Sequence, residues 1–266
     1  MRIAISALSL KPGRTGGGET VLRNLIPALP AVDPQIEYVL FVNGNNRHLF
    51  TGLPPSVVLH EASRWASTPG RRIVYELLIM PLVVRRLKID LFFAVNQIFA
   101  PWMPCRVSAL VQNLFYYHYR EFSSSYPAGS YAMRELRYRL YVGLGGICNR
   151  RASHVVAVSE CTKNAVIEHD GIASGQVHVV PLALSAAHVP EAGSDETDRV
   201  RDRIGRAFLL YVGALAPYKN LDRVLVALAR REMRQRELAL VCIGFDQWGY
   251  GGRLRELANE LGIGDD

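Results

Sequence analysis

The chain has 266 residues, of which 49% are hydrophobic, and it carries a formal net charge of +7. This composition indicates a globular protein, and the length favours one large domain or two ordinary ones. The positive charge suits a polyanion, an anionic membrane face or a nucleotide diphosphate. A nucleic-acid partner is not expected, because no basic segment with interleaved aromatic residues resembles a known nucleic-acid module. No apolar segment approaches the ~20 residues that span a bilayer.

The four cysteines form no C-x-x-C pair, and the N-terminus begins a strand pattern instead of a signal peptide. Both features predict a protein of the reducing cytoplasm. Neither G-x-x-x-x-G-K nor D-x-D occurs, which argues against a P-loop NTPase and against a transferase that chelates a metal. We therefore expect no metal site.

Short apolar segments alternate with stretches of helical periodicity along the first two thirds of the chain, which predicts an α/β fold with a parallel sheet covered on both faces. The predicted strands are Ile3–Leu8, Tyr38–Val42, Val57–Leu59, Leu91–Val95, Ser108–Val111, Val155–Val158 and Val177–Val180. The first helix carries Pro27 near its end. Proline removes an N–H and clashes with the preceding turn, so we expect it to kink or stop this helix.

The pattern is lost between residues 184 and 206, where alanine, proline, glycine, serine and charged residues dominate. We therefore predict a first domain over residues 1–184, a linker over 185–206 and a second α/β domain over 207–266. The elements expected in the second domain are strand Ala207–Val212, helix Asn220–Arg231, strand Leu238–Ile243 and helix Gly252–Leu261. Two strands do not close a doubly wound domain, so the sequence predicts a truncated second domain.

A strand followed by a glycine and a helix predicts a phosphate site in the second domain. The apolar segment 208–212 leads to Gly213, and a helical pattern begins at Asn220, directly after Lys219. Free backbone N–H groups and the positive end of the helix dipole favour an anion there, and the lysine adds a mobile charge.

A similar unit opens the chain, where the first strand leads to Gly16, Gly17 and Gly18 before an apolar helix face. Glycines allow backbone N–H groups to approach a ligand, although an ordinary tight turn before a helix would also use them. Two such units predict two nucleotide-type domains that face one ligand. The third glycine of a dinucleotide fingerprint is replaced by Val21, which argues against NAD.

Four motifs occur in one order along the chain: GGGE at residues 16–19, Val158-Ser159-Glu160, Val179-Val180-Pro181 and YVG…PYKNL at 211–221. Together they resemble family 4 (group 1) glycosyltransferases of the GT-B type over nearly the whole chain. The resemblance implies two Rossmann-like domains, the first on the acceptor side and the second, incomplete, on the donor side. It also implies a retaining, metal-independent hexosyltransferase without cofactor that moves a sugar from a nucleotide-diphosphate sugar to a glycan or lipid-linked acceptor in surface polysaccharide synthesis.

The resemblance also implies roles for single residues. Lys219 would neutralise the leaving diphosphate, whereas the arginine that often follows the strand-end glycine in the family is Ala214 here. Gln112 matches the position of a family histidine near the transferred sugar; an amide can hydrogen-bond a hydroxyl but cannot act as a general base. Ser159 is expected to cap a helix near the interdomain cleft.

Some alternatives stay open at this point. The family's acidic pair, E-x7-E, falls beyond Asp266 in the family's order, so we expect the fragment itself to be inactive. A non-catalytic nucleotide- or glycan-binding fragment and a GT-B-like nucleotide-sugar epimerase are the rival functions. His118 lies near Gln112, in an aromatic segment over residues 115–119 that is equally typical of a packed loop. Basic helical stretches at 71–72, 85–88 and 134–151 would suit peripheral contact with an anionic membrane, or simply face solvent.

Overall fold

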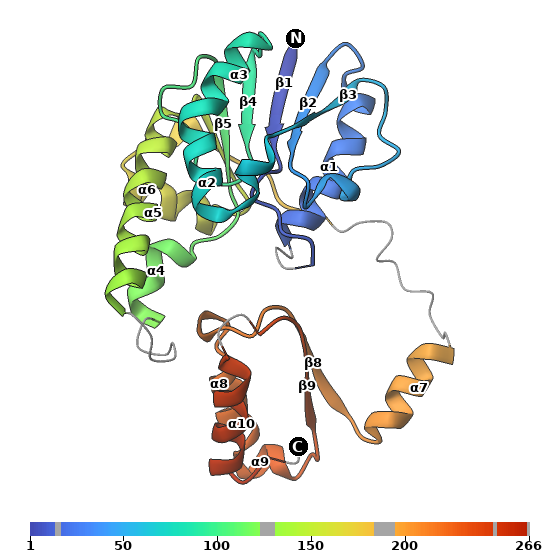
Figure 1. Ribbon diagram of the computed structural model, residues 1–266. Helices are drawn as coiled ribbons and strands as arrows, with labels where there is room; N and C mark the ends of the chain where they lie inside the picture. Colours follow the sequence, from blue (N-terminus) through green and yellow to red (C-terminus); the bar gives the residue numbers. More distant parts are fainter. Residues whose placement is uncertain (14–16, 123–130, 184–194, 247–248, 265–266) are drawn as a thin grey trace. The chain divides into compact units, whose positions relative to one another are not determined.

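The computed structural model describes residues 1–13, 17–122, 131–183, 195–246 and 249–264. The chain divides into two compact units. The first comprises Met1–Tyr117 and Ala132–Leu184, and the second comprises His118–Tyr131 and Ser185–Asp266. Each unit has its own sheet and its own hydrophobic core, and each is described by itself (Figure 1).

The first unit is built on a seven-stranded parallel sheet with strand order β3-β2-β1-β4-β5-β6-β7. Its strands are β1 (Arg2–Ser6), β2 (Glu37–Val42), β3 (Val57–Glu61), β4 (Leu91–Ala94), β5 (Arg106–Val111), β6 (His154–Ala157) and β7 (Val177–Val179). All seven correspond to predicted strands, and the predicted parallel sheet is confirmed.

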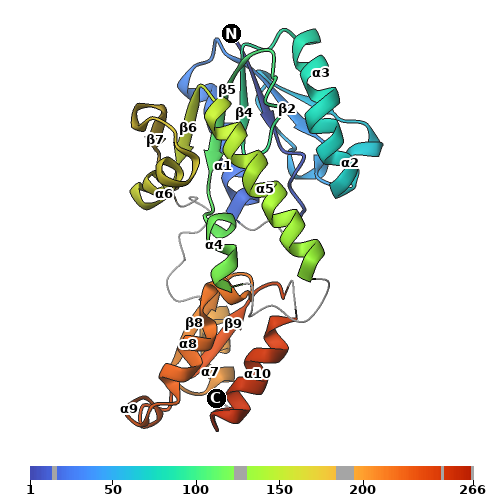
Figure 2. The ribbon, with the colours of Figure 1, turned by 90° about the vertical axis from the view of Figure 1, so that its left-hand side faces the viewer.

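Helices cover both faces of this sheet. Neighbouring residues of a strand point to opposite faces, so each strand contributes side chains to two cores. In β1, Ala4 belongs to one core cluster and Ile5 to the other. The cluster with Ile5 also contains Leu22 and Ile26 of α1 (Gly17–Val32). The opposite face is covered by the remaining helices, as Figures 1 and 2 show: α2 (Pro69–Val74), the π-helical turn η3 (Tyr75–Ile79), α3 (Met80–Arg86), α5 (Tyr131–Arg151) and α6 (Glu160–Asp170).

Two local features differ from one of the alternatives that the sequence left open. Helix α1 does not stop at Pro27; it continues through Pro30 to Val32, so of the expected kink or stop, the stop is excluded. Leu29, beyond the first proline, packs on the same core cluster as the earlier apolar residues, and this burial offsets the missing backbone hydrogen bond. The aromatic segment after β5 is a helix, α4 (Phe115–Phe122), and not a loop. Asn113 Oδ1 accepts the Phe115 N–H at 2.6 Å, which satisfies one free donor at the start of this helix.

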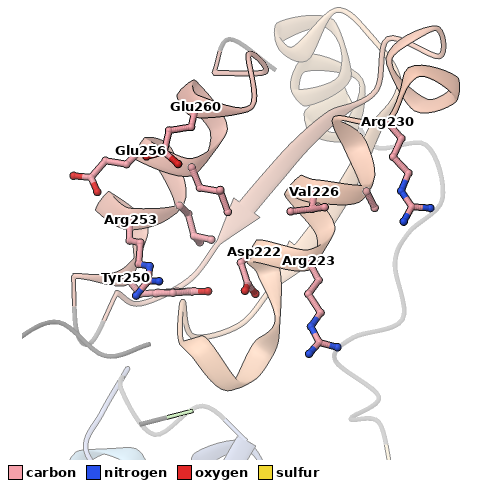
Figure 3. A pocket seen from close by; sticks show the side chains of 11 residues that line it. Asp222, Arg223, Val226, Arg230, Tyr250, Arg253, Glu256 and Glu260 are labelled. Carbon is pink, nitrogen blue, oxygen red and sulfur yellow. The ribbon is translucent and has the colours of Figure 1, made fainter. Parts of the chain in front are cut away.

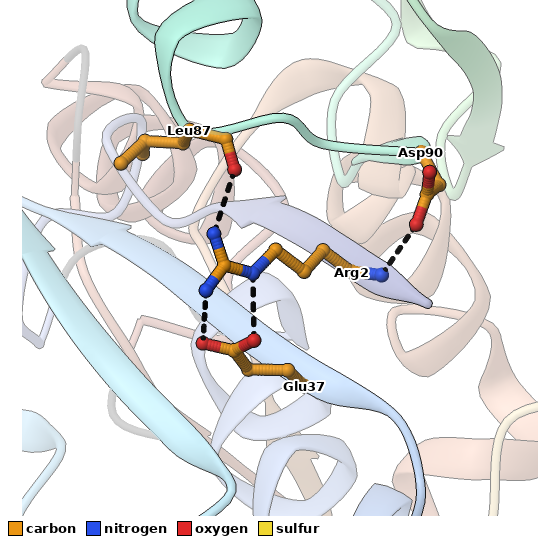
Figure 4. Close-up of polar contacts among 4 residues, drawn as sticks. All are labelled: Arg2, Glu37, Leu87 and Asp90. Atoms are coloured by element: carbon orange, nitrogen blue, oxygen red, sulfur yellow. Dashed lines mark hydrogen bonds and ion pairs between the residues drawn. The ribbon is translucent and has the colours of Figure 1, made fainter.

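Arg2 joins three parts of the chain at the amino edge of the sheet (Figure 4). Its guanidinium donates to both carboxylate oxygens of Glu37, with Nε 2.6 Å from Oε2 and Nη2 3.0 Å from Oε1. Nη1 donates to the Leu87 carbonyl at 3.0 Å, and the backbone N–H of Arg2 donates to Asp90 Oδ2 at 2.7 Å. These contacts tie β1 to its neighbour β2 and to the turn that precedes β4.

The second unit contains two parallel strands, β8 (Phe208–Val212) and β9 (Ala239–Ile243), as the sequence predicts. Its helices are α7 (Asp195–Ile204), α8 (Leu221–Leu228), α9 (Arg231–Arg234) and α10 (Tyr250–Glu260). Helix α7 lies in the stretch 185–206, where composition indicated only a linker. The arginines of its last turn, Arg201 and Arg203, complement the helix dipole.

Helices α8 and α10 pack through Leu221, Leu225 and Leu254 into a core of their own. Other apolar side chains of the two strands stay exposed, among them Val212 at 71%. All four cysteines are free. Within the described parts of the chain, no helix has both the length and the apolar character needed to cross a bilayer.

Candidate functional site

The strand order of the first unit reverses between β1 and β4. After β1 the chain adds β2 and β3 on one side, and it returns to place β4 on the other side of β1. In open α/β sheets, ligands bind outside the carboxyl ends of the strands at such a reversal. The loops that follow β1 and its neighbours therefore form the candidate site of the first unit.

Two buried asparagines hold the loop after β1. Asn46 Nδ2 donates to the carbonyl of Ala7 at 2.7 Å and to that of Leu10 at 3.3 Å. Asn43 Nδ2 donates to the Leu8 carbonyl at 3.2 Å, and Asn46 Oδ1 accepts the Asn43 N–H at 2.9 Å. These asparagines were not among the residues predicted for the site. Their position after the second strand was the signal for a polar contact with the first loop.

The structure brings Gly18 and Gln112 together. A Cβ built on Gly18, at the start of α1, would lie 3.8 Å from Gln112 Oε1 and 3.7 Å from Leu10 Cδ2. Gln112 follows β5, and its Nε2 is buried without a hydrogen-bond partner among the described residues. An amide donor thus stays available beside the glycine start of α1. Gly17 has no such neighbour, since a Cβ there would meet nothing within 4 Å. Gly16 lies outside the described residues.

Ser159 caps helix α6, as predicted. Its Oγ accepts the Thr162 N–H at 3.1 Å and lies 3.0 Å from Thr162 Oγ1. The hydroxyl is therefore engaged within the helix start, and a contact with ligand stays a prediction. His118 lies in α4, where its Nδ1 is 2.8 Å from Glu121 Oε1.

In the second unit, Gly213 and Gly244 allow the ends of β8 and β9 to approach closely. A Cβ on Gly213 would lie 2.9 Å from Tyr211 Oη, and one on Gly244 would lie 1.7 Å from the Gly213 carbonyl oxygen. Tyr211 Oη also donates to the Ala214 carbonyl at 2.8 Å. Packing alone explains why Gly213 has no side chain, and its role toward a ligand stays a prediction.

Lys219 and Asn220 form the turn before α8. Residues Pro217–Lys219 form a 3-10 turn, and Asn220 has a left-handed backbone with φ 56° and ψ 32°. Asparagine tolerates this conformation better than most residues. The Asn220 side chain does not cap α8. Lys219 is exposed, with its Nζ 5.1 Å from the centroid of the Tyr218 ring. An unneutralised cation at this helix end is unfavourable by ~0.3–1 kcal/mol, so a bound anion would relieve it.

The start of α10 is capped by a carboxylate, whereas α8 carries Asp222 in its first turn and has no cap from the side chain of Asn220. Asp246 Oδ1 accepts the Tyr250 N–H at 2.8 Å, and Oδ2 accepts the Gly251 N–H at 3.0 Å. A second anion would meet both a negative charge and N–H groups that already have acceptors. Of these two helix starts, α8 is the one whose N-cap side chain makes no cap, and a phosphate there stays a prediction because Asp222 places a negative charge in the same turn.

A groove of about 640 Å³ lies between α8 and α10 (Figure 3). Asp222 and Tyr250 face each other at one end of it, and burial, followed by the charge of Asp222, raises the pKa of Tyr250 to about 12. Arginines and glutamates from the two helices line its sides. None of the residues predicted for the site lines this groove, so it does not mark the predicted phosphate position.

Solved structures match the chain over both of its units. HepE (Alr3699) from Anabaena, in complex with UDP and glucose, matches with a TM-score of 0.62 and 18% identity, covering 99% of this chain and 67% of that chain. The apo lipopolysaccharide outer core galactosyltransferase WaaB matches with a TM-score of 0.56 and 18% identity, covering 100% of this chain and 66% of that chain. The UDP-GlcNAc 2-epimerase from Methanocaldococcus jannaschii matches with a TM-score of 0.50 and 14% identity, covering 100% of this chain and 70% of that chain. The chain thus spans about two thirds of the length of these proteins.

At these identities the likeness establishes the fold, which is the GT-B fold expected from the sequence. No curated protein matches the chain in sequence. The sequence model of Glycosyltransferase Family 4 matches residues 15–187, which include Gly18, Gln112 and Ser159. This match covers more than half of the chain. The chain therefore belongs to Glycosyltransferase Family 4.

Proposed function

We propose that this chain acts in the transfer of a sugar from a nucleotide-diphosphate sugar to a glycan or lipid-linked acceptor. The proposal rests on the family match over residues 15–187. We further propose that the reaction retains the anomeric configuration, uses neither metal nor cofactor, transfers a hexose, and serves surface polysaccharide synthesis in the cytoplasm. These finer statements come from the resemblance of the sequence motifs to the family.

The second unit would bind the diphosphate of the donor. Lys219 and the N–H groups at the start of α8, which the side chain of Asn220 does not cap, would contact the diphosphate, on the side of the helix start away from the carboxylate of Asp222 in the first turn. When the glycosidic bond breaks, negative charge develops on the diphosphate. Donors that are already oriented stabilise such charge more in the transition state than in the ground state. The role of this chain in catalysis would thus be to stabilise the leaving group.

The first unit would contact the transferred sugar through Gln112. Its Nε2 is a buried donor without a partner in the described structure, and the Oε1 of the same amide lies near Gly18 at the carboxyl edge of the sheet. A buried donor of this kind gains a hydrogen bond when a hydroxyl group enters the site. An amide does not exchange a proton as a base does, so Gln112 would position the sugar without acid–base catalysis.

The first test is the binding of UDP to the full chain by calorimetric titration, with UDP chosen because HepE was crystallised with it. We expect Lys219→Ala to weaken binding by the ~1.5–3 kcal/mol typical of hydrogen bonds to charged groups. Lys163→Ala, which removes a lysine from α6 in the first unit, is the matched control and should bind as the wild type does. Equal affinities of wild type and Lys219→Ala would contradict the assignment.

An epimerase is the second candidate, since the chain also resembles the fold of UDP-GlcNAc 2-epimerase at a TM-score of 0.50. Nuclear magnetic resonance of UDP-sugar incubated with the protein and an acceptor separates the possibilities. A transferase releases UDP and forms a glycoside, whereas an epimerase forms a second UDP-sugar. Binding of UDP without either product would fit a non-catalytic binding protein as well as the inactive fragment that the resemblance implies.

A further inference from the structure

Two histidines meet at one edge of the sheet of the first unit. The last strand of this sheet, β7, pairs in parallel with β6 (Figure 2). His178 in β7 pairs with Val156 of β6, and His154 stands two residues before Val156. Because side chains alternate along a strand, His154 and His178 leave the sheet on the same face. The pairing of β6 with β7 thus brings together two histidines that are 24 residues apart in the chain.

The two imidazole rings are close together and exposed. His154 Nδ1 lies 3.1 Å from His178 Nε2. The ring centroids are 5.2 Å apart, and the ring planes are tilted by 49°. Both residues are exposed, so ions in solution reach these nitrogens. A neutral imidazole has one nitrogen with a free lone pair, and this is the form that binds metal ions.

The separation of the two nitrogens fits two ligands of one metal ion. With metal–nitrogen bonds of ~2.0–2.1 Å, two ligand nitrogens lie ~3.3 Å apart on a tetrahedral ion and ~2.9 Å apart at neighbouring corners of a square or octahedron. The distance of 3.1 Å lies between these values. Each lone pair would point about 40° away from the line that joins the nitrogens. Rotation of the exposed rings provides this change, because the ring torsion of histidine has a broad minimum.

We propose that His154 and His178 bind one divalent ion of a late first-row transition metal. Imidazole suits Zn²⁺, Ni²⁺ and Cu²⁺, and of these Cu²⁺ should bind most tightly. Mg²⁺ and Ca²⁺ prefer oxygen ligands and should not bind. Water would complete the coordination, because among the residues that the structure describes no group of three or more histidine, cysteine or acidic side chains could hold a metal.

This site is separate from the proposed sugar transfer. His154 is the first residue of β6, at the amino end of the strand, whereas the candidate site lies outside the carboxyl ends of the strands. The ion would therefore take no part in the transfer, for which we propose no metal. Motifs in the sequence do not indicate this site, because the two histidines become neighbours only through strand pairing.

The test is a titration of the full chain with Zn²⁺, followed by nitrogen-15 magnetic resonance of the histidine rings. We expect the ring signals of His154 and His178 to shift with a common midpoint, while His48, an exposed histidine in the turn Arg47–Leu49, keeps its signal. With half of the ligands of a structural zinc site, the dissociation constant should be about 1–200 µM. The free cysteines also bind zinc, and the ring signals distinguish that binding from this site.

His178→Gln separates metal binding from the hydrogen bond between the rings. The glutamine amide still forms a hydrogen bond with His154, but it is not among the zinc ligands of proteins. We expect His178→Gln and His154→Ala each to weaken zinc binding at this site by about 70-fold or more. His48→Ala is the matched control and should leave the affinity unchanged.

Circular dichroism checks that each variant is folded, and the ring signals of the wild type alone decide if a variant is not. Ring signals of His154 and His178 that do not move with Zn²⁺ would overturn the proposal. So would equal zinc binding at this site by wild type and His178→Gln. In calorimetric competition, Cu²⁺ should displace Zn²⁺ and Mg²⁺ should not; displacement by Mg²⁺ would contradict ligation by imidazole.

Discussion

Replacing Glu76 by glutamine tests the cost of a buried carboxyl group in the turn η3 between α2 and α3. Glu76 Oε2 lies 3.6 Å from Arg72 Nε, and within the described residues neither atom has a hydrogen-bond partner. Burial raises the pKa of Glu76 from its usual 4.5 to about 7, although the charge of Arg72 acts in the opposite direction. Desolvation of the charged form is thus the larger effect.

The direction of the pH effect follows from where the proton binds more tightly. The folded protein holds the Glu76 proton to higher pH than the unfolded chain does, so this group favours folding below pH 4.5. That contribution is lost as the pH rises from 4.5 to about 7. One pKa unit corresponds to about 1.4 kcal/mol, so the loss amounts to about 3 kcal/mol.

Glu76→Gln removes the ionisation and nearly keeps the shape of the side chain. Its stability relative to wild type should therefore increase by about 3 kcal/mol between about pH 4 and about pH 8. Urea unfolding of both proteins at each pH measures this difference, and peptide-resolved hydrogen exchange over residues 1–117 assigns the transition to the first unit. Glu168→Gln, on the exposed side of α6, is the control. A difference between wild type and Glu76→Gln that stays the same at both pH values would refute the reasoning.

Three further outcomes are expected. Asn46→Ala leaves buried carbonyls of the loop after β1 without a donor, so urea unfolding should show a loss of about 2 kcal/mol or more, and an unchanged midpoint would mean that another group holds the loop. Gly244→Ala forces a Cβ against the neighbouring strand end and should lower the unfolding free energy of the second unit by about 1–3 kcal/mol or more. The control Gly252→Ala, where a Cβ meets nothing within 4 Å, should leave that free energy unchanged or raise it, and equal effects of the two variants would contradict the packing argument. Hydrogen exchange should be slower over residues 1–184 than over residues 207–266, whose two strands leave apolar side chains exposed, and uniform protection would contradict this.

The strands were predictable from sequence because a parallel sheet buried on both faces selects continuous apolar segments. Their ends were less predictable, as β1 shows. Ala7 and Leu8 are as buried as the strand itself, so the apolar pattern extends past Ser6. The strand ends earlier because the carbonyls of these two residues bond to asparagine side chains that follow β2. Hydrophobicity reports burial and does not distinguish between a strand partner and a side-chain partner.

The site could be predicted where it depends on local sequence and not where it depends on distant contacts. The turn at Lys219 and Asn220 and the cap at Ser159 follow from residues next to each other, and both occur near the predicted positions. The approach of Gly18 to Gln112 joins residues from separate elements, which spacing along one chain does not encode. The cap of α10 by Asp246 was missed because its acceptor lies several residues before the helix.

The placement of β1 has a consequence for how the protein is synthesised. This strand is synthesised before both of its neighbours, yet it occupies an interior position of the sheet, with β2 on one side and β4 on the other. The partners of Arg2 lie 35 and 88 residues later in the chain. Until β4 emerges, one side of β1 is an unpaired apolar edge of the kind that promotes aggregation of nascent chains. A chaperone that binds extended apolar segments would therefore be needed longest over the first ninety or so residues, and slower translation before β4 would prolong that exposure.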